Sequence, residues 1–172
     1  MRNILGHWLV SLRHYFWMCL LLSSPERLPY NPYAFALTVF AYFAIGGLLV
    51  DNANDYGVIA ARILLEMAML AAIVRVGLNI RQWPQRFAQT FSALVGINLL
   101  VTAVSIPLQA LVGVDIEQPS ALALYLFVVI LVWNLAAISL VFKRAFEIST
   151  PLSAMLSFSY FVVNYIIVVL FV

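Results

Sequence analysis

Two ionisable residues, Arg62 and Glu66, lie within a long apolar segment at residues 57–78. Because they are four residues apart, a helix places both side chains on one face, with Glu66 near the middle of the segment. Asp55, just before the segment, joins this stripe if the helix begins a turn earlier. Ionisable groups at membrane depth are costly and usually face protein or water. The stripe therefore indicates a proton or ion relay, a contact with a partner's charge, or an ion pair that neutralises itself and orients the helix.

Uncharged polar residues form two more stripes and one isolated position in the later apolar segments. The residues are Asn98, Thr102, Ser105 and Gln109, then Asn134 beside Trp133, and finally Ser153, Ser157, Tyr160 and Asn164. Each stripe falls on one helix face. Such stripes commonly join helices through interhelical hydrogen bonds. A hydrated path or a small-solute site through the bundle is the alternative interpretation.

The elements that must position these residues follow from the composition. The chain has 172 residues, of which 65% are hydrophobic and 9% charged, whereas a soluble domain carries about 25% charged residues. Five apolar segments have about the 20 residues needed to cross a bilayer; they are 33–50, 57–78, 90–112, 120–142 and 151–172. The sequence therefore predicts an all-α polytopic bundle of five transmembrane helices at residues 29–172, preceded by a separate segment at residues 1–28.

The positive charges alternate between connectors. The cationic connectors and flanks hold Arg2, Arg13 and Arg27, then Arg75, Arg81 and Arg86, and then Lys143 and Arg144. The first and third connectors hold no Lys or Arg, and their charged residues are Asp51, Asp55, Asp115 and Glu117. Cytoplasmic loops carry the excess of Lys and Arg. This pattern predicts a cytoplasmic N-terminus and a C-terminus on the other side of the membrane.

The segment at residues 1–28 has an amphipathic pattern. At 100° per residue one face carries Ile4, Leu5, Trp8, Leu9, Leu12, Tyr15 and Phe16, and the other carries Arg2, Asn3, His7, Arg13 and His14. Such a helix lies in the membrane interface with its cations toward anionic headgroups. It either anchors the bundle or docks a cytoplasmic partner. The candidate interface or lipid contacts are Arg2, Trp8, Arg13, Arg81, Arg86, Lys143 and Arg144.

Catalytic patterns are absent from the sequence. It has no Ser/His/Asp set, no HExxH and no glycine-rich phosphate loop. The single cysteine, Cys19, excludes an internal disulfide and a thiolate metal cluster, and the two histidines lie in the N-terminal segment. The net charge of +2 arises from membrane flanks. We therefore expect no enzyme activity, no cofactor or metal, and no nucleic-acid partner.

Three short motifs give the chain a family likeness. They are Ser24-Pro25-Glu26-Arg27-Leu28, the run Arg86–Leu94 leading toward Ile106-Pro107-Leu108, and Val132-Trp133-Asn134-Leu135 followed by Phe142-Lys143-Arg144-Ala145-Phe146. With these motifs and its layout the chain resembles the bacterial branch of the Yip1-type proteins. The resemblance implies a non-enzymatic, multi-pass protein of the bacterial inner membrane that works through partners, with its C-terminus in the periplasm. The acidic-aromatic glycine motif of the eukaryotic trafficking members is missing.

Two functions are compatible with this pattern. The first is a scaffold or accessory subunit of an inner-membrane complex, acting through helix–helix and cytoplasmic-face contacts with a membrane-protein partner or a second copy. The second is a small channel or transporter subunit whose polar path involves Glu66, Arg62 and the third-segment stripe. Because five spans are few for a transporter built from inverted repeats, the second function requires an oligomer or a larger complex.

Overall fold

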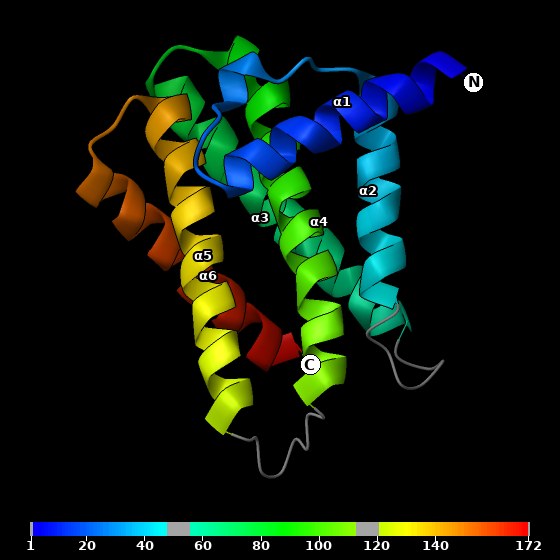
Figure 1. Cartoon of the computed structure of the whole chain (residues 1–172). Coiled ribbons are helices and arrows are strands. Elements are labelled where there is room, and N and C mark those ends of the chain that lie inside the picture. The colour runs from blue at the N-terminus through cyan, green and yellow to red at the C-terminus, as the bar shows by residue number, and fades with distance from the viewer. Residues whose placement is uncertain (1, 48–55, 113–120, 172) are drawn as a thin grey trace.

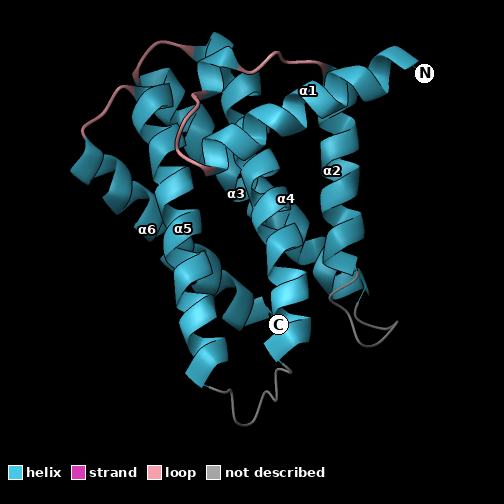
Figure 2. Ribbon diagram, viewed as in Figure 1, coloured by secondary structure: helices cyan, strands magenta, loops and turns pink. Residues whose placement is uncertain are grey.

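A computed structural model describes residues 2–47, 56–112 and 121–171, and within these ranges the chain is helical with no strand. The helices are α1 (Arg2–Cys19), α2 (Pro32–Gly47), α3 (Tyr56–Ile80), α4 (Phe87–Val112), α5 (Ala121–Phe146) and α6 (Thr150–Phe171), with single 3-10 turns at Pro25–Arg27 and Pro84–Arg86. Figure 2 shows these helices and the short loops between them. The predicted all-α fold is confirmed.

Three helical segments are long and apolar enough to cross a membrane: Ala60–Ile80, Pro84–Pro107 and Leu124–Phe146. This finding supports a membrane-embedded protein but gives three spans in the described residues instead of the five predicted. The predicted span at 33–50 is represented by α2, whose 16 residues reach only about 24 Å. That length falls short of a hydrocarbon layer of about 30 Å.

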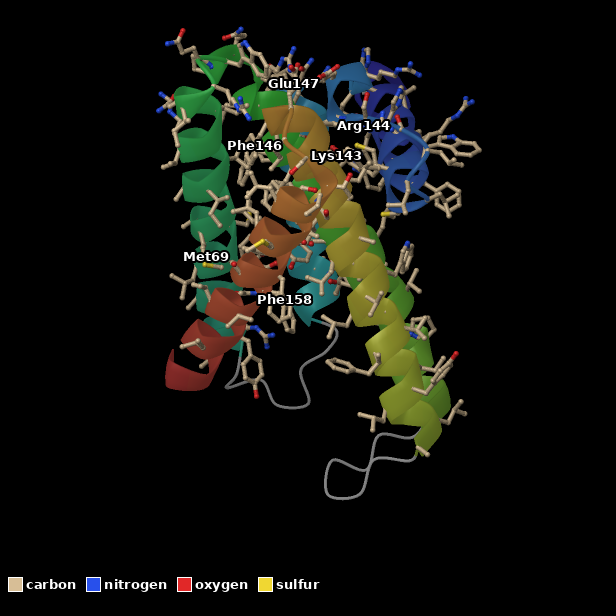
Figure 3. All side chains as sticks on the ribbon, turned by 90° about the vertical axis from the view of Figure 1, so that its left-hand side faces the viewer. Met69, Lys143, Arg144, Phe146, Glu147 and Phe158 are labelled. Carbon is tan, nitrogen blue, oxygen red and sulfur yellow. The ribbon has the colours of Figure 1, made fainter. Side chains whose placement is uncertain are left out.

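Helices α2 to α6 run alternately up and down, and α1 lies obliquely across one end of this bundle (Figure 1). The end where α3 and α5 finish and α4 begins carries Arg81, Arg86, Lys143 and Arg144, and we call it the basic end. Figure 3 shows Lys143, Arg144 and Glu147 gathered there. The opposite end holds the beginnings of α3 and α5. The basic residues of alternate connectors therefore come together at one end of the fold.

The C-terminal half of helix α1 is inserted between other helices of the bundle. The Tyr15 hydroxyl forms a 2.8 Å hydrogen bond with the Ser92 hydroxyl of α4, and the Tyr15 ring lies against Gly96, where a Cβ atom would collide with it. The Trp133 indole N–H donates to the Cys19 carbonyl over 2.7 Å. Trp133 is roughly 20 Å along α5 from the basic end. The C-terminal half of α1 is therefore packed among α2, α4 and α5.

This insertion corrects the predicted division of α1 into an apolar membrane face and a polar face. Tyr15, Met18 and Cys19 are buried in the protein core, whereas Leu5, Leu9 and Phe16 remain exposed. The apolar arc is thus shared between the bundle and the surface that lipid would cover. Helical periodicity shows which residues share a face, but it cannot show that a neighbouring helix covers half of that face.

Three helices end at a residue in the left-handed conformation that is not glycine. These residues are Leu21 (φ 63°), Gln82 (φ 62°) and Glu147 (φ 50°). After Gln82, the Trp83 amide donates to the Leu78 carbonyl over 2.9 Å, as in the Schellman motif. Equivalent bonds follow the other two residues, from Leu22 to Trp17 and from Ile148 to Lys143. Glycine is the usual residue at this position because it has no Cβ to strain.

Replacing Gln82 with glycine is therefore expected to stabilise the protein by about 0.5 to 1 kcal/mol, because relief of left-handed strain outweighs the entropy gained by the unfolded chain. Thermal unfolding in detergent measures the change. Gln85→Gly, three residues later in a 3-10 turn, is the control and should lower stability. A fall in stability with Gln82→Gly would contradict the argument.

Arg86, predicted as an interface or lipid contact, is half-buried and pairs with two carboxylates of the protein. Its guanidinium is 3.1 Å from the Glu26 carboxylate and 3.4 Å from that of Glu147, and it lies over the Trp83 ring at 4.4 Å. It thereby links the loop after α1 to the end of α5. Trp8 is half-buried, and its indole N–H has no partner in the described residues. The remaining predicted contacts, Arg13, Arg81, Lys143 and Arg144, are exposed, while the Arg2 side chain lies outside the described part.

The Cys19 thiol is enclosed where α1 ends. Its side chain is buried, and burial raises the pKa of the Cys19 thiol to about 12. Because thiolate is the reactive form, we expect Cys19 to resist a soluble maleimide at pH 8 and to react readily once the protein is unfolded in SDS. Ser149→Cys, at an exposed position, placed in a Cys19→Ser chain is the positive control. Equal labelling rates at the two positions would contradict the docking of α1.

Candidate functional site

The carboxylate of Glu66 is hydrogen-bonded from three other helices. One oxygen, Oε2, accepts the Tyr42 hydroxyl of α2 at 2.9 Å. The other, Oε1, accepts the Asn98 amide of α4 at 2.8 Å and the Tyr160 hydroxyl of α6 at 3.1 Å. Glu66 itself belongs to α3. A single carboxylate therefore ties four helices together.

This junction lies at mid-depth in the bundle. Glu66, Asn98 and Tyr160 each fall near the middle of their own helix, as does Asn134 of α5. Antiparallel helices of similar length bring their middles to the same level. Glu66 therefore lies at the level where the middles of α3, α4, α5 and α6 meet.

A cavity of about 180 Å³ opens beside the Glu66 carboxylate. Its polar lining consists of Tyr42, Arg62, Glu66, Asn98, Thr102, Asn134, Tyr160 and Asn164, and its apolar lining of Leu131, Leu135, Ile138 and Phe161. The residues come from α2 to α6. Since one water occupies about 30 Å³ of liquid, the cavity has room for several waters or a small hydrated solute.

Two amide oxygens at the cavity have no hydrogen-bond partner in the described part of the protein. They are Oδ1 of Asn98 and Oδ1 of Asn134. Asn98 is only 5% exposed, and its amide nitrogen is already committed to Glu66. Buried acceptors are almost always satisfied by protein or water. Two residues of the cavity lining therefore each hold an enclosed acceptor that a bound water or ion would complete.

Arg62 and Glu66 do not form the self-neutralising pair that their spacing predicted. Of the described residues, only Arg86 makes a salt bridge to a carboxylate, and Glu66 takes its hydrogen bonds from two tyrosines and an asparagine. The Arg62 side chain is exposed and lines the cavity one turn from Glu66. Spacing shows that two side chains share a face, but a closer donor on a neighbouring helix can displace the local partner.

The cavity extends from mid-depth away from the basic end. Arg62, Thr102 and Asn164 each lie one helical turn farther from the basic end than Glu66, Asn98 and Tyr160, respectively. Toward the basic end the bundle is instead filled by a core cluster of apolar side chains. Its most buried members are Tyr15, Met18, Leu70, Val74, Leu78, Leu94, Ile97, Val141 and Phe142. The polar cavity is thus closed by an apolar layer on the basic side, and α1 forms part of that layer.

Seven of the polar residues predicted inside the apolar segments line this one cavity, namely Arg62, Glu66, Asn98, Thr102, Asn134, Tyr160 and Asn164. Asp55 lies outside the described residues, as does the side chain of Gln109. Of the remaining stripe residues, Ser153 joins α6 to α5 through a 3.0 Å hydrogen bond to Ser139. Ser105 instead donates to the Thr102 carbonyl in its own helix. The stripe residues near the basic end therefore join helices, and those at mid-depth line a polar cavity.

Tyr42 was not among the predicted site residues, although it donates to Glu66 and lines the cavity. Its segment reads as apolar and aromatic, and Tyr is common at membrane interfaces. The signal that could have identified it is its position well inside the segment at 33–50, because a buried Tyr hydroxyl usually finds a partner.

Comparison of the chain with protein-family models, with curated proteins and with solved structures finds no match in any of the three. The resemblance to Yip1-type proteins therefore stays a prediction from the sequence motifs.

The groups around the cavity can bind a small solute. Among the described residues, no group of three or more His, Cys, Asp or Glu side chains gathers as a metal site. The cavity lining offers one carboxylate, amides, hydroxyls and a guanidinium. Such groups can recognise a small polar or charged solute through several hydrogen bonds at once.

Proposed function

We propose that this protein is a non-enzymatic membrane subunit that binds a small polar or charged solute in the cavity around Glu66 and takes part in its passage across the membrane. The observation that carries the proposal is a half-buried carboxylate, hydrogen-bonded from three helices, in a mid-depth cavity whose lining includes two asparagines with an unpartnered amide oxygen among the described residues. Polar groups at membrane depth commonly mark substrate and ion pathways.

The proposal includes a membrane arrangement. We place the basic end in the cytoplasm of a bacterial inner membrane, with the N-terminus there and the C-terminus in the periplasm, and we count α2 and α6 as spans beside the three longer segments. Alternating connectors favour this orientation. The cavity then opens toward the periplasm, and the apolar layer with α1 closes it from the cytoplasm.

The test is solute entry into proteoliposomes. Vesicles containing the purified protein are placed in isosmotic solutions of small neutral polyols, urea, amino acids and monovalent salts, and swelling is followed by light scattering. We expect at least one solute to enter faster than into empty vesicles, and Glu66→Leu to abolish the difference. Glu26→Leu, which removes a carboxylate at the surface, is the matched control and should leave entry unchanged. No acceleration for any solute would overturn the passage of solute.

Accessibility of the cavity is tested separately by cysteine labelling. In a Cys19→Ser chain, Thr102→Cys and Asn164→Cys should react with a membrane-impermeant thiol reagent added from the periplasmic side. Ser92→Cys, in the apolar layer beside Tyr15, should not react. Protection of all three positions would show that the cavity is closed and would remove the basis for binding from that side.

A scaffold or accessory-subunit role is the second candidate, and one observation favours it. The first half of α5 has little cover from the rest of the protein, with Leu122, Leu124, Tyr125 and Phe127 all 59–67% exposed. This half of α5 runs to the end of the bundle opposite the basic end (Figure 1). Lipid, a membrane-protein partner or a second copy of the chain could cover it. Mild-detergent purification with mass spectrometry would support this role if one stoichiometric partner were lost when Leu124 and Phe127 were both changed to alanine.

A further inference from the structure

We propose that the solute held beside Glu66 is a small monovalent cation, bound by oxygen atoms of Glu66, Asn98 and Asn134. This inference rests on the proposed function and names the class of its ligand. It is drawn from the acceptors that remain free around the cavity, from the number of negative charges there, and from the position of Arg62.

The first argument is the count of free lone pairs. A carboxylate offers about four acceptor positions, two on each oxygen. Oε1 of Glu66 accepts two hydrogen bonds and Oε2 accepts one, so Oε2 keeps one free position. Oδ1 of Asn98 and Oδ1 of Asn134 have no partner among the described residues. The free positions of these three side chains are therefore oxygen acceptors, which suit a cation or a donor but repel an anion.

The hydrogen-bond network also fixes how Asn98 is turned. Its amide nitrogen is used by Glu66 at 2.8 Å, so its oxygen cannot exchange places with the nitrogen without losing that bond. Asn98 is buried and its side chain lines the cavity. The Asn98 amide oxygen is therefore held in a fixed direction. Binding a ligand would cost little additional ordering of this side chain.

The second argument is charge. Among the described residues that line the cavity, Glu66 is the one acidic residue. Sites for Ca²⁺ usually use several carboxylates, and Mg²⁺ keeps a strict octahedral shell. One carboxylate neutralises one positive charge, and an uncompensated divalent charge at membrane depth would be costly. The charge of the site therefore matches a monovalent ion.

The third argument is Arg62, which lines the cavity one turn nearer its open side and makes no salt bridge to Glu66. A cation that enters would pass this guanidinium, so Arg62 opposes cation binding. Replacing Arg62 and replacing Glu66 should therefore change cation affinity in opposite directions. A general loss of stability could not produce opposite signs.

The test measures stabilisation by cations in the whole purified protein. Thermal unfolding in detergent is followed at constant ionic strength while N-methyl-D-glucamine chloride is replaced by lithium, sodium, potassium or ammonium chloride. We expect one of these ions to raise the unfolding temperature in a saturable way. Glu66→Gln and the pair Asn98→Ala, Asn134→Ala should each weaken the apparent affinity by about tenfold or more, and Arg62→Gln should strengthen it. Asn79→Ala, on the exposed side of α3, is the matched control.

The outcomes separate this inference from the proposed function. One outcome is that no cation stabilises the protein while a neutral solute still enters vesicles in a Glu66-dependent way. The inferred cation site is then wrong, and the proposed passage of solute is retained. If Glu66→Gln and Arg62→Gln shift the affinity in the same direction, the cation is not bound at Glu66, and this too overturns the inference. If a cation binds but no solute enters vesicles, the site is a structural ion site and the transport role is wrong.

Discussion

Replacing Gly96 with valine should release α1 from the bundle and destabilise the protein by about 3 kcal/mol. A Cβ atom at Gly96 already collides with the Tyr15 ring, and Tyr15 is only 1% exposed, so the ring has no free space to enter. Overpacking of a filled core typically costs about 1 to 3 kcal/mol, and valine adds two further methyl groups. Chemical denaturation in detergent micelles measures the loss, and maleimide labelling of Cys19 reports the undocking of α1.

The same substitution at Gly6 is the matched control, because no atom lies within 4 Å of a Cβ built there. Gly6→Val should cost little and leave Cys19 protected. Combining Gly96→Val with Tyr15→Ala should recover part of the stability, since the smaller side chain makes room for valine. If Gly96→Val left both the stability and the labelling rate unchanged, α1 would not be packed against α4 as the structure shows.

Replacing Glu66 with leucine should lower the free energy of unfolding by about 2 to 4 kcal/mol. The change removes the shared acceptor of Tyr42, Asn98 and Tyr160 and leaves three donors without their partner. Hydrogen bonds between membrane helices are worth about 0.6 to 2 kcal/mol each, and a donor stranded in a buried site loses more than the bond itself. Unfolding by SDS titration from mixed micelles measures the difference.

Replacing one hydrogen-bond donor at a time gives a finer test of the stability expected from Glu66. Tyr42→Phe removes one hydroxyl and one bond, so its loss should be about a third of that of Glu66→Leu. Glu26→Leu removes a carboxylate from a surface ion pair, which is worth about 1 kcal/mol or less. If Glu66→Leu were no more destabilising than Glu26→Leu, the carboxylate would not hold the four helices together.

The sequence by itself determined the class of fold and most of the cavity lining. Long apolar runs can only be helices in a bilayer, because every backbone polar group must be satisfied within the segment. A polar side chain in such a run must turn away from lipid. For this reason Asn98, Thr102, Asn134 and Asn164 could be assigned to inward positions from their types and spacing alone. In the structure all four line the same cavity as Glu66.

Only the tertiary structure decided which groups meet. The sequence placed Arg62 beside Glu66 because local spacing is visible in it, but the donors that reach Glu66 come from positions 24, 32 and 94 residues away. The order of helices around the bundle sets these contacts, and no local pattern encodes that order. The burial of Tyr15 against Gly96 and the pairing of Arg86 with Glu26 and Glu147 have the same origin. Periodicity fixes the face of a helix that avoids lipid, whereas the partner on that face is selected by long-range packing.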